Sequence, residues 1–179
     1  MTIDPTPPRG RNRTRLVRLA LALFAALYVV LTVSSYRQKS ATWDEPLHLA
    51  AGHSILTAGD YRVDAEHPPL IRAWAALPQA IGGAVRLDES AIGQPDPARW
   101  YGNQFHFGRS FLYGQPDATR TLESGRFMIV LLGLALGCLV FAWSRQLYGP
   151  GPAIAALALY LLEPNGLAHT RLITTDPVS

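Results

Sequence analysis

Three apolar blocks, separated by polar stretches, dominate the hydrophobic pattern of the 179-residue chain. The first block, residues 16–33, is interrupted only by Arg18, and about 18 helical residues extend roughly 27 Å, close to the thickness of a bilayer's hydrocarbon core. The second block covers residues 127–143, and the third covers residues 152–162. The pattern therefore predicts an all-α, polytopic membrane protein with about three transmembrane helices, at residues 16–36, 126–144 and 152–168.

The composition agrees with this class. Apolar residues make up 49% of the chain and charged residues 16%, below the roughly 25% that is usual in soluble domains. The single cysteine, Cys138, excludes an intrachain disulfide and a cysteine metal site. In the second block, Gly133 and Gly137 stand four residues apart, a spacing that lets helices approach closely in lipid.

A cleaved signal peptide is the alternative explanation of the first block, because basic residues precede it. The block is longer than the usual signal core of about 7–15 residues. No small-x-small cleavage pattern follows Tyr36, so the sequence favours a retained membrane anchor.

The distribution of charge sets the expected topology. Five arginines lie before the first block or at its start: Arg9, Arg11, Arg13, Arg15 and Arg18. Because basic residues concentrate on the cytoplasmic side, residues 1–15 are expected to form a cytoplasmic tail and residues 37–125 an outer loop. Residues 145–151 then form a cytoplasmic turn, and residues 169–179 begin a second outer loop. The basic cluster favours contact with anionic membrane lipids, and no nucleic-acid partner is expected.

Two adjacent carboxylates, Asp44 and Glu45, follow the first predicted span. Pro46 suits the first turn of a helix, so residues 47–57 are expected to be helical and to stop at Gly59. Asp44 then occupies the N-cap position, and both acids have a purely structural explanation at the helix amino terminus. The same pair also suits base catalysis or metal binding, and the residues alone leave both explanations open.

A second outer helix is expected to begin after Glu66, His67 and two prolines. Residues 69–85 carry a single charge but are interrupted by proline and glycine, which predicts an interfacial helix along the headgroups rather than a span. The amino terminus of such a helix offers backbone N–H groups to an anion such as phosphate. His67 is therefore either an exposed turn residue or a phosphate contact.

Two further stretches carry candidate chemistry. In residues 88–125, aromatic side chains alternate with arginines, and they can stack on sugar rings, lie at the membrane interface or pack a small cap. The sequence does not decide among these three. After the third block the chain reaches His169, Arg171 and Asp176, which places cationic and anionic groups at headgroup depth. The expected topology brings these residues to the same side of the membrane as Asp44.

These motifs, in this order, resemble the beginning of a GT-C fold glycosyltransferase of the family 39 type, which includes protein O-mannosyltransferases and the aminoarabinose transferases that modify lipid A. The resemblance covers roughly residues 16–179. The matching residues are Trp43-Asp44-Glu45, Gly59-Asp60-Tyr61, Glu66-His67-Pro68-Pro69-Leu70 and Ala168-His169-x-Arg171-Leu172 with Thr174-Thr175-Asp176. The resemblance implies inverting transfer of a sugar from a polyprenyl-phosphate donor, at the outer face of a bacterial cytoplasmic membrane. The sugar and the acceptor stay open.

The resemblance also implies roles for particular residues. The acidic site residues are Asp44, Glu45, Glu66 and Asp176, with Asp44 as the base that takes a proton from a hydroxyl acceptor. The donor-phosphate contacts are His67, Arg126, His169 and Arg171. A bound divalent metal ion is another way to stabilise the leaving phosphate, and its ligands are unknown. In the aminoarabinose transferases a lysine stands where this chain has a histidine before Pro68, so the donor contacts are carried over less directly.

Members of this family continue through many more spans, so we expect the chain to be an amino-terminal fragment that is inactive in isolation. Two other functions stay open. One is a membrane module that binds lipid phosphate or transports an ion or solute without chemistry, and the other is an inactive truncated relative. Transport requires acidic groups within the spans, and only Glu163 lies near one, which favours the enzyme.

Overall fold

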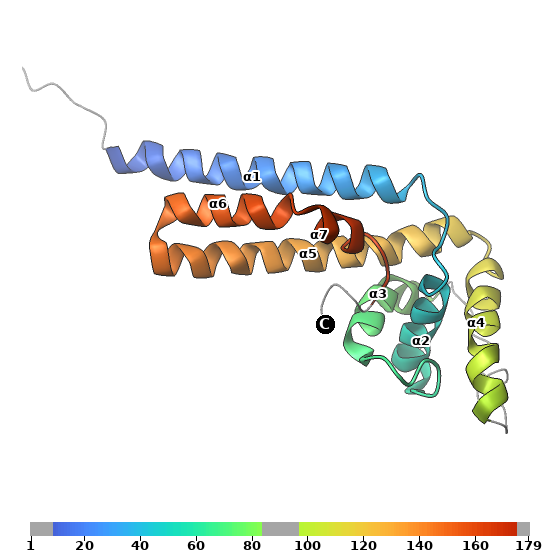
Figure 1. Cartoon of the computed structure of the whole chain (residues 1–179). Helices are drawn as coiled ribbons and strands as arrows, with labels where there is room; N and C mark the ends of the chain where they lie inside the picture. The colour runs from blue at the N-terminus through green and yellow to red at the C-terminus, as the bar shows by residue number, and fades with distance from the viewer. Residues whose placement is uncertain (1–8, 84–96, 175–179) are drawn as a thin grey trace, which may run out of the picture.

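The computed structural model describes residues 9–83 and 97–174, and the regular secondary structure in this part of the chain is helical without strands, which confirms the all-α prediction. Figure 1 shows the order and arrangement of the helices. Their bounds are α1 Arg9–Tyr36, α2 Glu45–Ala58, α3 Pro69–Gly82, α4 Pro97–Tyr113, α5 Ala118–Tyr148, α6 Pro150–Leu161 and α7 Pro164–His169.

Two of the described helices are long and apolar enough to span a membrane. They are the Thr14–Tyr36 part of α1 and the whole of α5, Ala118–Tyr148, each with a mean hydropathy of 2.4 in its most apolar window. Only 11% of that window is buried in α1 and 28% in α5, so most of these apolar side chains lie on the outside of the protein. Exposed apolar surface on this scale is typical of helices that contact lipid, which supports a location in a membrane.

The third predicted span, residues 152–168, is two helices rather than one. The first of them, α6, has 12 residues, about 18 Å of helix, which is short of the roughly 30 Å hydrocarbon core. Pro164 disfavours helical backbone in the residue before it, and Glu163 is extended with φ −65° and ψ 121°. The Glu163 carboxylate then caps α7, accepting hydrogen bonds from the backbone N–H groups of Asn165 (3.0 Å) and Gly166.

Helices α1, α5 and α6 lie side by side, while α2, α3 and α4 gather at the end where α1 finishes and α5 begins (Figure 1). The turn at Gly149, between α5 and α6, lies at the opposite end (Figure 1). Helix α7 follows α6 back to the end that carries α2–α4. The cap helices and the α5–α6 turn therefore lie at opposite ends of the long helices (Figure 1). Which of these ends faces the cytoplasm stays a prediction.

The two glycines of the second apolar block allow this close packing. A Cβ on Gly133 would lie 2.1 Å from the Tyr28 hydroxyl oxygen of α1, and one on Gly137 would lie 3.2 Å from Leu161 of α6. Each glycine therefore faces a different neighbouring helix. The four-residue spacing places both contacts on α5 one turn apart.

Helices α2, α3 and α4 form a cap. Its hydrophobic core includes Leu49, Ile71, Ala75 and Phe111, and α5 also contributes side chains to it. The expected stop at Gly59 is confirmed, since α2 ends at Ala58 and its C-cap Gly59 has φ 65°. Helix α3, which was expected over residues 69–85, ends at Gly82, and its C-cap Gly83 has φ 61°. The left-handed backbone at these two positions suits glycine and ends each helix.

Candidate functional site

A buried ion pair between Glu45 and Arg126 lies where the cap meets the long helices. Arg126 Nη2 donates to Glu45 Oε2 at 2.6 Å, and Nε donates to Oε1 at 2.8 Å, so the pair is bidentate. Both side chains are almost fully buried, at 1% and 0% exposure. Glu45 is the first residue of α2 and Arg126 belongs to α5, and the pair therefore joins the cap to the long apolar helix α5.

The remaining N–H groups of Arg126 bind the segment that follows α1. Nη1 donates to the carbonyl oxygens of Tyr36 (3.0 Å) and Lys39 (2.9 Å), and Nη2 donates to that of Ser40 (2.9 Å). A guanidinium has five N–H groups, and all five are engaged by protein acceptors. The structure gives Arg126 an anchoring position with no N–H left for a phosphate, and its predicted phosphate contact stays a prediction.

Glu45 is equally saturated. Its carboxylate also accepts hydrogen bonds from the backbone N–H groups of Thr42 (2.8 Å) and Ile173 (3.0 Å). Burial raises the pKa of Glu45, but the hydrogen bonds from Arg126 and from these two N–H groups outweigh it, so the pKa lies below its usual value. A carboxylate held in this way is a poor proton acceptor, and we therefore place Glu45 in a positioning role.

Asp44, its neighbour, lies in a different environment. It occupies the N-cap position of α2, as predicted, but its carboxylate makes no cap hydrogen bond and is exposed. No hydrogen bond or ion pair joins this carboxylate to any side chain in the described part of the chain. Helix capping therefore does not account for Asp44, and its carboxylate is available to a ligand.

The hydrogen bond from Ile173 brings the end of the described chain to this place. It sets the segment after α7 beside the first turn of α2, next to Asp44. Asp176 itself lies outside the described residues. Thr174, two residues before it, has a buried hydroxyl without a partner among the described residues.

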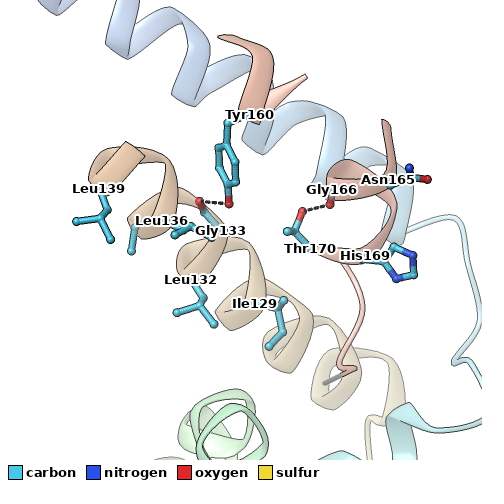
Figure 2. A pocket seen from close by; sticks show the side chains of 11 residues that line it. Ile129, Leu132, Gly133, Leu136, Leu139, Tyr160, Asn165, Gly166, His169 and Thr170 are labelled. Atoms are coloured by element: carbon cyan, nitrogen blue, oxygen red, sulfur yellow. Dashed lines mark hydrogen bonds between the residues drawn. The ribbon is translucent and has the colours of Figure 1, made fainter. Parts of the chain in front are cut away.

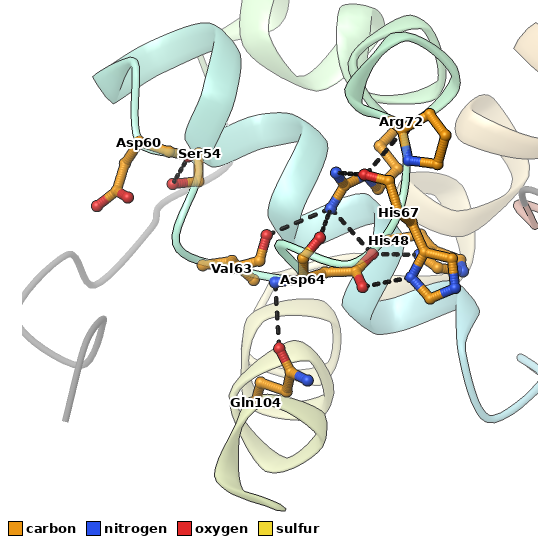
Figure 3. Close-up of polar contacts among 9 residues, drawn as sticks. His48, Ser54, Asp60, Val63, Asp64, His67, Arg72 and Gln104 are labelled. Atoms are coloured by element: carbon orange, nitrogen blue, oxygen red, sulfur yellow. Dashed lines mark hydrogen bonds and ion pairs between the residues drawn. The ribbon is translucent and has the colours of Figure 1, made fainter. Parts of the chain in front are cut away.

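A second polar cluster holds the loop between α2 and α3 (Figure 3). The Asp64 carboxylate, 2% exposed, receives a hydrogen bond on each oxygen: Oδ2 lies 2.7 Å from His48 Nδ1 and Oδ1 lies 2.6 Å from His67 Nδ1. Burial raises the pKa of Asp64, but the hydrogen bonds from the two histidines outweigh it and lower the pKa. One carboxylate therefore orients two imidazoles, and three potential metal ligands lie within 4.8 Å of one another.

Arg72 of α3 organises this loop from the other side (Figure 3). Its Nη1 lies 2.9 Å from Asp64 Oδ2, and its guanidinium also donates to the carbonyl oxygens of Val63 (3.3 Å), Asp64 and His67. The loop is thus folded around one buried cation. The single charged residue of α3, Arg72, is therefore explained by its packing inside this loop.

Glu66 lies on the exposed outer side of the same loop, and no side-chain contact ties it to the rest of the described chain. The loop itself is fixed to α2 through His48, one turn beyond Glu45. The structure therefore tethers the loop that carries Glu66 to the helix that begins beside Asp44. The catalytic role of Glu66 stays a prediction.

The two predicted phosphate contacts after α6 lie at the same end of the bundle. Arg171 donates from Nε to the Ala168 carbonyl oxygen at 3.1 Å and from Nη1 to the Ser35 hydroxyl oxygen of α1. Its Nη2 has no partner within the described chain. His169 is exposed and lies at one end of an apolar groove (Figure 2).

That groove has a volume of about 550 Å³ and runs between α5 and the α6–α7 segment. Its walls are mainly apolar side chains of α5, with polar groups where α7 ends; among the lining residues are Leu132, Leu136, Leu139, Tyr160, His169 and Thr170. The groove does not include Asp44, Glu45 or Glu66. It is therefore separate from these three acids and extends along α5 (Figure 2).

The structure places His48, Asp64 and Arg72 in one buried network, and the sequence predicted no role for them. A signal was present for His48, which is three residues after Glu45 and so falls one turn along the same helix. Nothing in the sequence pairs it with Asp64, because that contact depends on how the loop folds around Arg72.

No family model, no curated protein and no solved structure matches this chain.

Proposed function

We propose that the chain is part of a membrane glycosyltransferase that moves a sugar from a polyprenyl-phosphate donor to a hydroxyl acceptor, with Asp44 as the base. The resemblance of its motifs to GT-C enzymes of the family 39 type suggests the reaction. The observation that carries the proposal is the state of the Asp44 carboxylate, which is exposed, uncapped and adjacent to a saturated buried ion pair.

The contrast between the two neighbouring acids supports this assignment. The Glu45 carboxylate accepts hydrogen bonds from Arg126 and from two backbone N–H groups, and these bonds fix the first turn of α2. Asp44 is held in place by that turn while its own oxygens stay open. A general base needs this combination of a fixed backbone and an unoccupied carboxylate.

The groups around the end of α6 suit the donor. A polyprenyl phosphate has a long apolar chain and a charged head, and the apolar groove along α5 ends at His169 and Thr170. The side chain of Arg171, two residues after His169, keeps Nη2 available. A guanidinium N–H and an exposed imidazole at that place are suitable partners for a phosphate oxygen.

The proposed step is a single displacement. The acceptor hydroxyl gives its proton to the Asp44 carboxylate while its oxygen forms a bond to the anomeric carbon of the donor sugar. The bond between that carbon and the phosphate oxygen breaks, and the polyprenyl phosphate leaves with the electron pair. Attack from the face opposite the leaving group inverts the anomeric centre, and Arg171 and His169 stabilise the negative charge on the phosphate.

The test is sugar transfer by the protein translated from its complete reading frame, reconstituted in liposomes with a series of polyprenyl-phosphate sugars. We expect Asp44→Asn to reduce kcat by about 10²–10⁴-fold, the usual contribution of a general base, with little change in donor binding. Asp117→Asn is the matched control, because Asp117 is an exposed N-cap aspartate of α5 away from the groove.

Two outcomes would contradict the proposal. Unchanged transfer by Asp44→Asn would remove this residue from the base role. Binding of polyprenyl phosphate without transfer of any sugar would favour a lipid-phosphate-binding module instead of an enzyme.

A further inference from the structure

We propose that His48, Asp64 and His67 form a binding site for a divalent transition-metal ion of the zinc type, within the loop that joins α2 to α3. This site is separate from the proposed base and from the apolar groove. The three ligand atoms, two imidazole nitrogens and one carboxylate oxygen, lie within 4.8 Å of one another. Two imidazoles and one carboxylate are a ligand set that zinc and related ions accept.

The distances require little rearrangement. Two ligands that each lie about 2.1 Å from an ion are separated by at most about 4.2 Å, so the three atoms need to close by less than about 1 Å. In the ion-free state each Nδ1–H donates to one oxygen of Asp64. An ion that takes these positions replaces the two ring protons at Nδ1, and each imidazole then carries its proton on Nε2.

Neighbouring residues already fix the orientation of the Asp64 carboxylate in the ion-free structure. Asp64 has φ 54°, a left-handed conformation that is uncommon for a residue other than glycine. Its backbone N–H donates to Gln104 Oε1 of α4 at 3.1 Å, and its Oδ2 is bound by Arg72 at 2.9 Å (Figure 3). Oδ1 points away from Arg72 toward His67. Hydrogen bonds of this kind to a ligating carboxylate are a common feature of metal sites, because they fix its orientation.

The position of His67 gives access to the site. His48 and Asp64 are 5% and 2% exposed, whereas the side chain of His67 is 43% exposed. An ion can therefore enter past His67 without unfolding the cap. Three protein ligands leave at least one coordination position, which water can fill from the same side.

The experiment uses the full chain in detergent micelles, without a histidine tag and freed of metal by dialysis against EDTA. Co²⁺ serves as the spectroscopic probe and Zn²⁺ as the competitor. We expect one Co²⁺ per chain, with visible absorption bands of a four- or five-coordinate ion that Zn²⁺ abolishes. His67→Ala should weaken Co²⁺ binding at least tenfold, because it removes one of three ligands.

His106→Ala is the matched control, since His106 is an exposed histidine of α4 outside the cluster. It should bind Co²⁺ like the unmodified chain. As a second measurement, Zn²⁺ should raise the unfolding temperature of the unmodified chain and of His106→Ala but not that of His67→Ala. This comparison keeps the test valid if His67→Ala is itself less stable.

Either of two results overturns the inference. One is the absence of stoichiometric Co²⁺ binding to the unmodified chain, and the other is equal affinity in the unmodified chain and His67→Ala. The readouts are absorption and melting, so the outcome is independent of whether the chain belongs to a glycosyltransferase.

Discussion

The backbone N–H of Ile173 donates a hydrogen bond to Oε1 of Glu45 at 3.0 Å, joining two residues that lie 128 positions apart in the chain. The same carboxylate binds Arg126 of α5 and the backbone of Thr42, before α2. Four segments thus meet on one buried acid. The hydrogen bond to Glu45 places the end of the described chain beside Asp44. In this way the fold brings together motifs that lie far apart in the sequence.

Loss of the Glu45 charge should strongly destabilise the protein. In Glu45→Gln, Arg126 stays buried without its counter-ion, and breaking a buried pair in this way usually costs about 3–5 kcal/mol. Thermal unfolding of the full chain in detergent measures the change. Glu123→Gln is the control, because Glu123 is only partly buried and forms a long ion pair (3.6 Å) with the exposed Arg37, so this substitution should cost less than about 1 kcal/mol. Equal effects of the two substitutions would argue against the anchoring role of Glu45.

Gly52→Ala should destabilise the cap, because a Cβ at this position would lie 2.0 Å from the backbone carbonyl oxygen of Arg72. That contact forces α2 and α3 apart, and overpacking of this kind typically costs about 1–3 kcal/mol. In Gly82→Ala the new Cβ has no atom within 4 Å, so this variant should be as stable as the unmodified chain or slightly more so. Equilibrium unfolding of both variants gives the comparison, and a neutral Gly52→Ala would show that the helices pack less closely than described.

Protonation of His53 should lower stability in mildly acidic solution. Burial lowers the pKa of His53 below its usual 6.5, so the folded protein favours the neutral ring. As the pH falls through 6.5 the unfolded chain takes up this proton first, and stability decreases until the pH reaches the lowered pKa. In His53→Gln the unfolding temperature should decline less between pH 7.5 and about pH 5.5. The other histidines are present in both proteins, so an equally steep decline in the variant would exclude His53 as a cause.

If Arg171 contacts the donor phosphate, Arg171→Gln should raise the KM for the polyprenyl-phosphate donor. A hydrogen bond to a charged group contributes about 1.5–3 kcal/mol, which corresponds to a loss of affinity of roughly 10- to 150-fold. Arg120→Gln, at an exposed position in the first turn of α5, should leave KM unchanged. A lower kcat with no change in KM would mean that Arg171 acts only on the charge that develops on the leaving phosphate. Unchanged KM and kcat would contradict any contact between Arg171 and the donor phosphate.

Two of the three cap helices, α2 and α3, were predictable because their ends carry local signals, whereas α4 lies in a stretch that the sequence left undecided. Pro46 and Gly59 bracket α2, and Pro68 and Pro69 mark the start of α3. These residues act through their own backbone preferences, which do not depend on the rest of the fold. The third predicted span, residues 152–168, is not a single helix, because Pro164 ends α6 and starts α7. That this segment crosses a membrane stays a prediction.

The roles of the charged residues could not be predicted in the same way. Asp44 and Glu45 are adjacent in sequence and chemically alike, yet one carboxylate is exposed and the other is saturated. The difference arises from Arg126, 81 residues away, and from Ile173. A sequence shows which groups can form such contacts, and only the packed chain shows which of them do.

The sequence by itself predicted the all-α class that the described residues show, the long apolar segments, the limits of α2, the start of α3, and an acidic pair at the start of α2. Hydropathy and the conformational preferences of proline and glycine are local properties, which explains their success. Only the tertiary structure decided that Arg126 and Glu45 neutralise each other, that Asp44 stays open, and that Asp64 gathers His48 and His67. Those outcomes depend on burial, since a charge removed from water must find a partner wherever the fold places one.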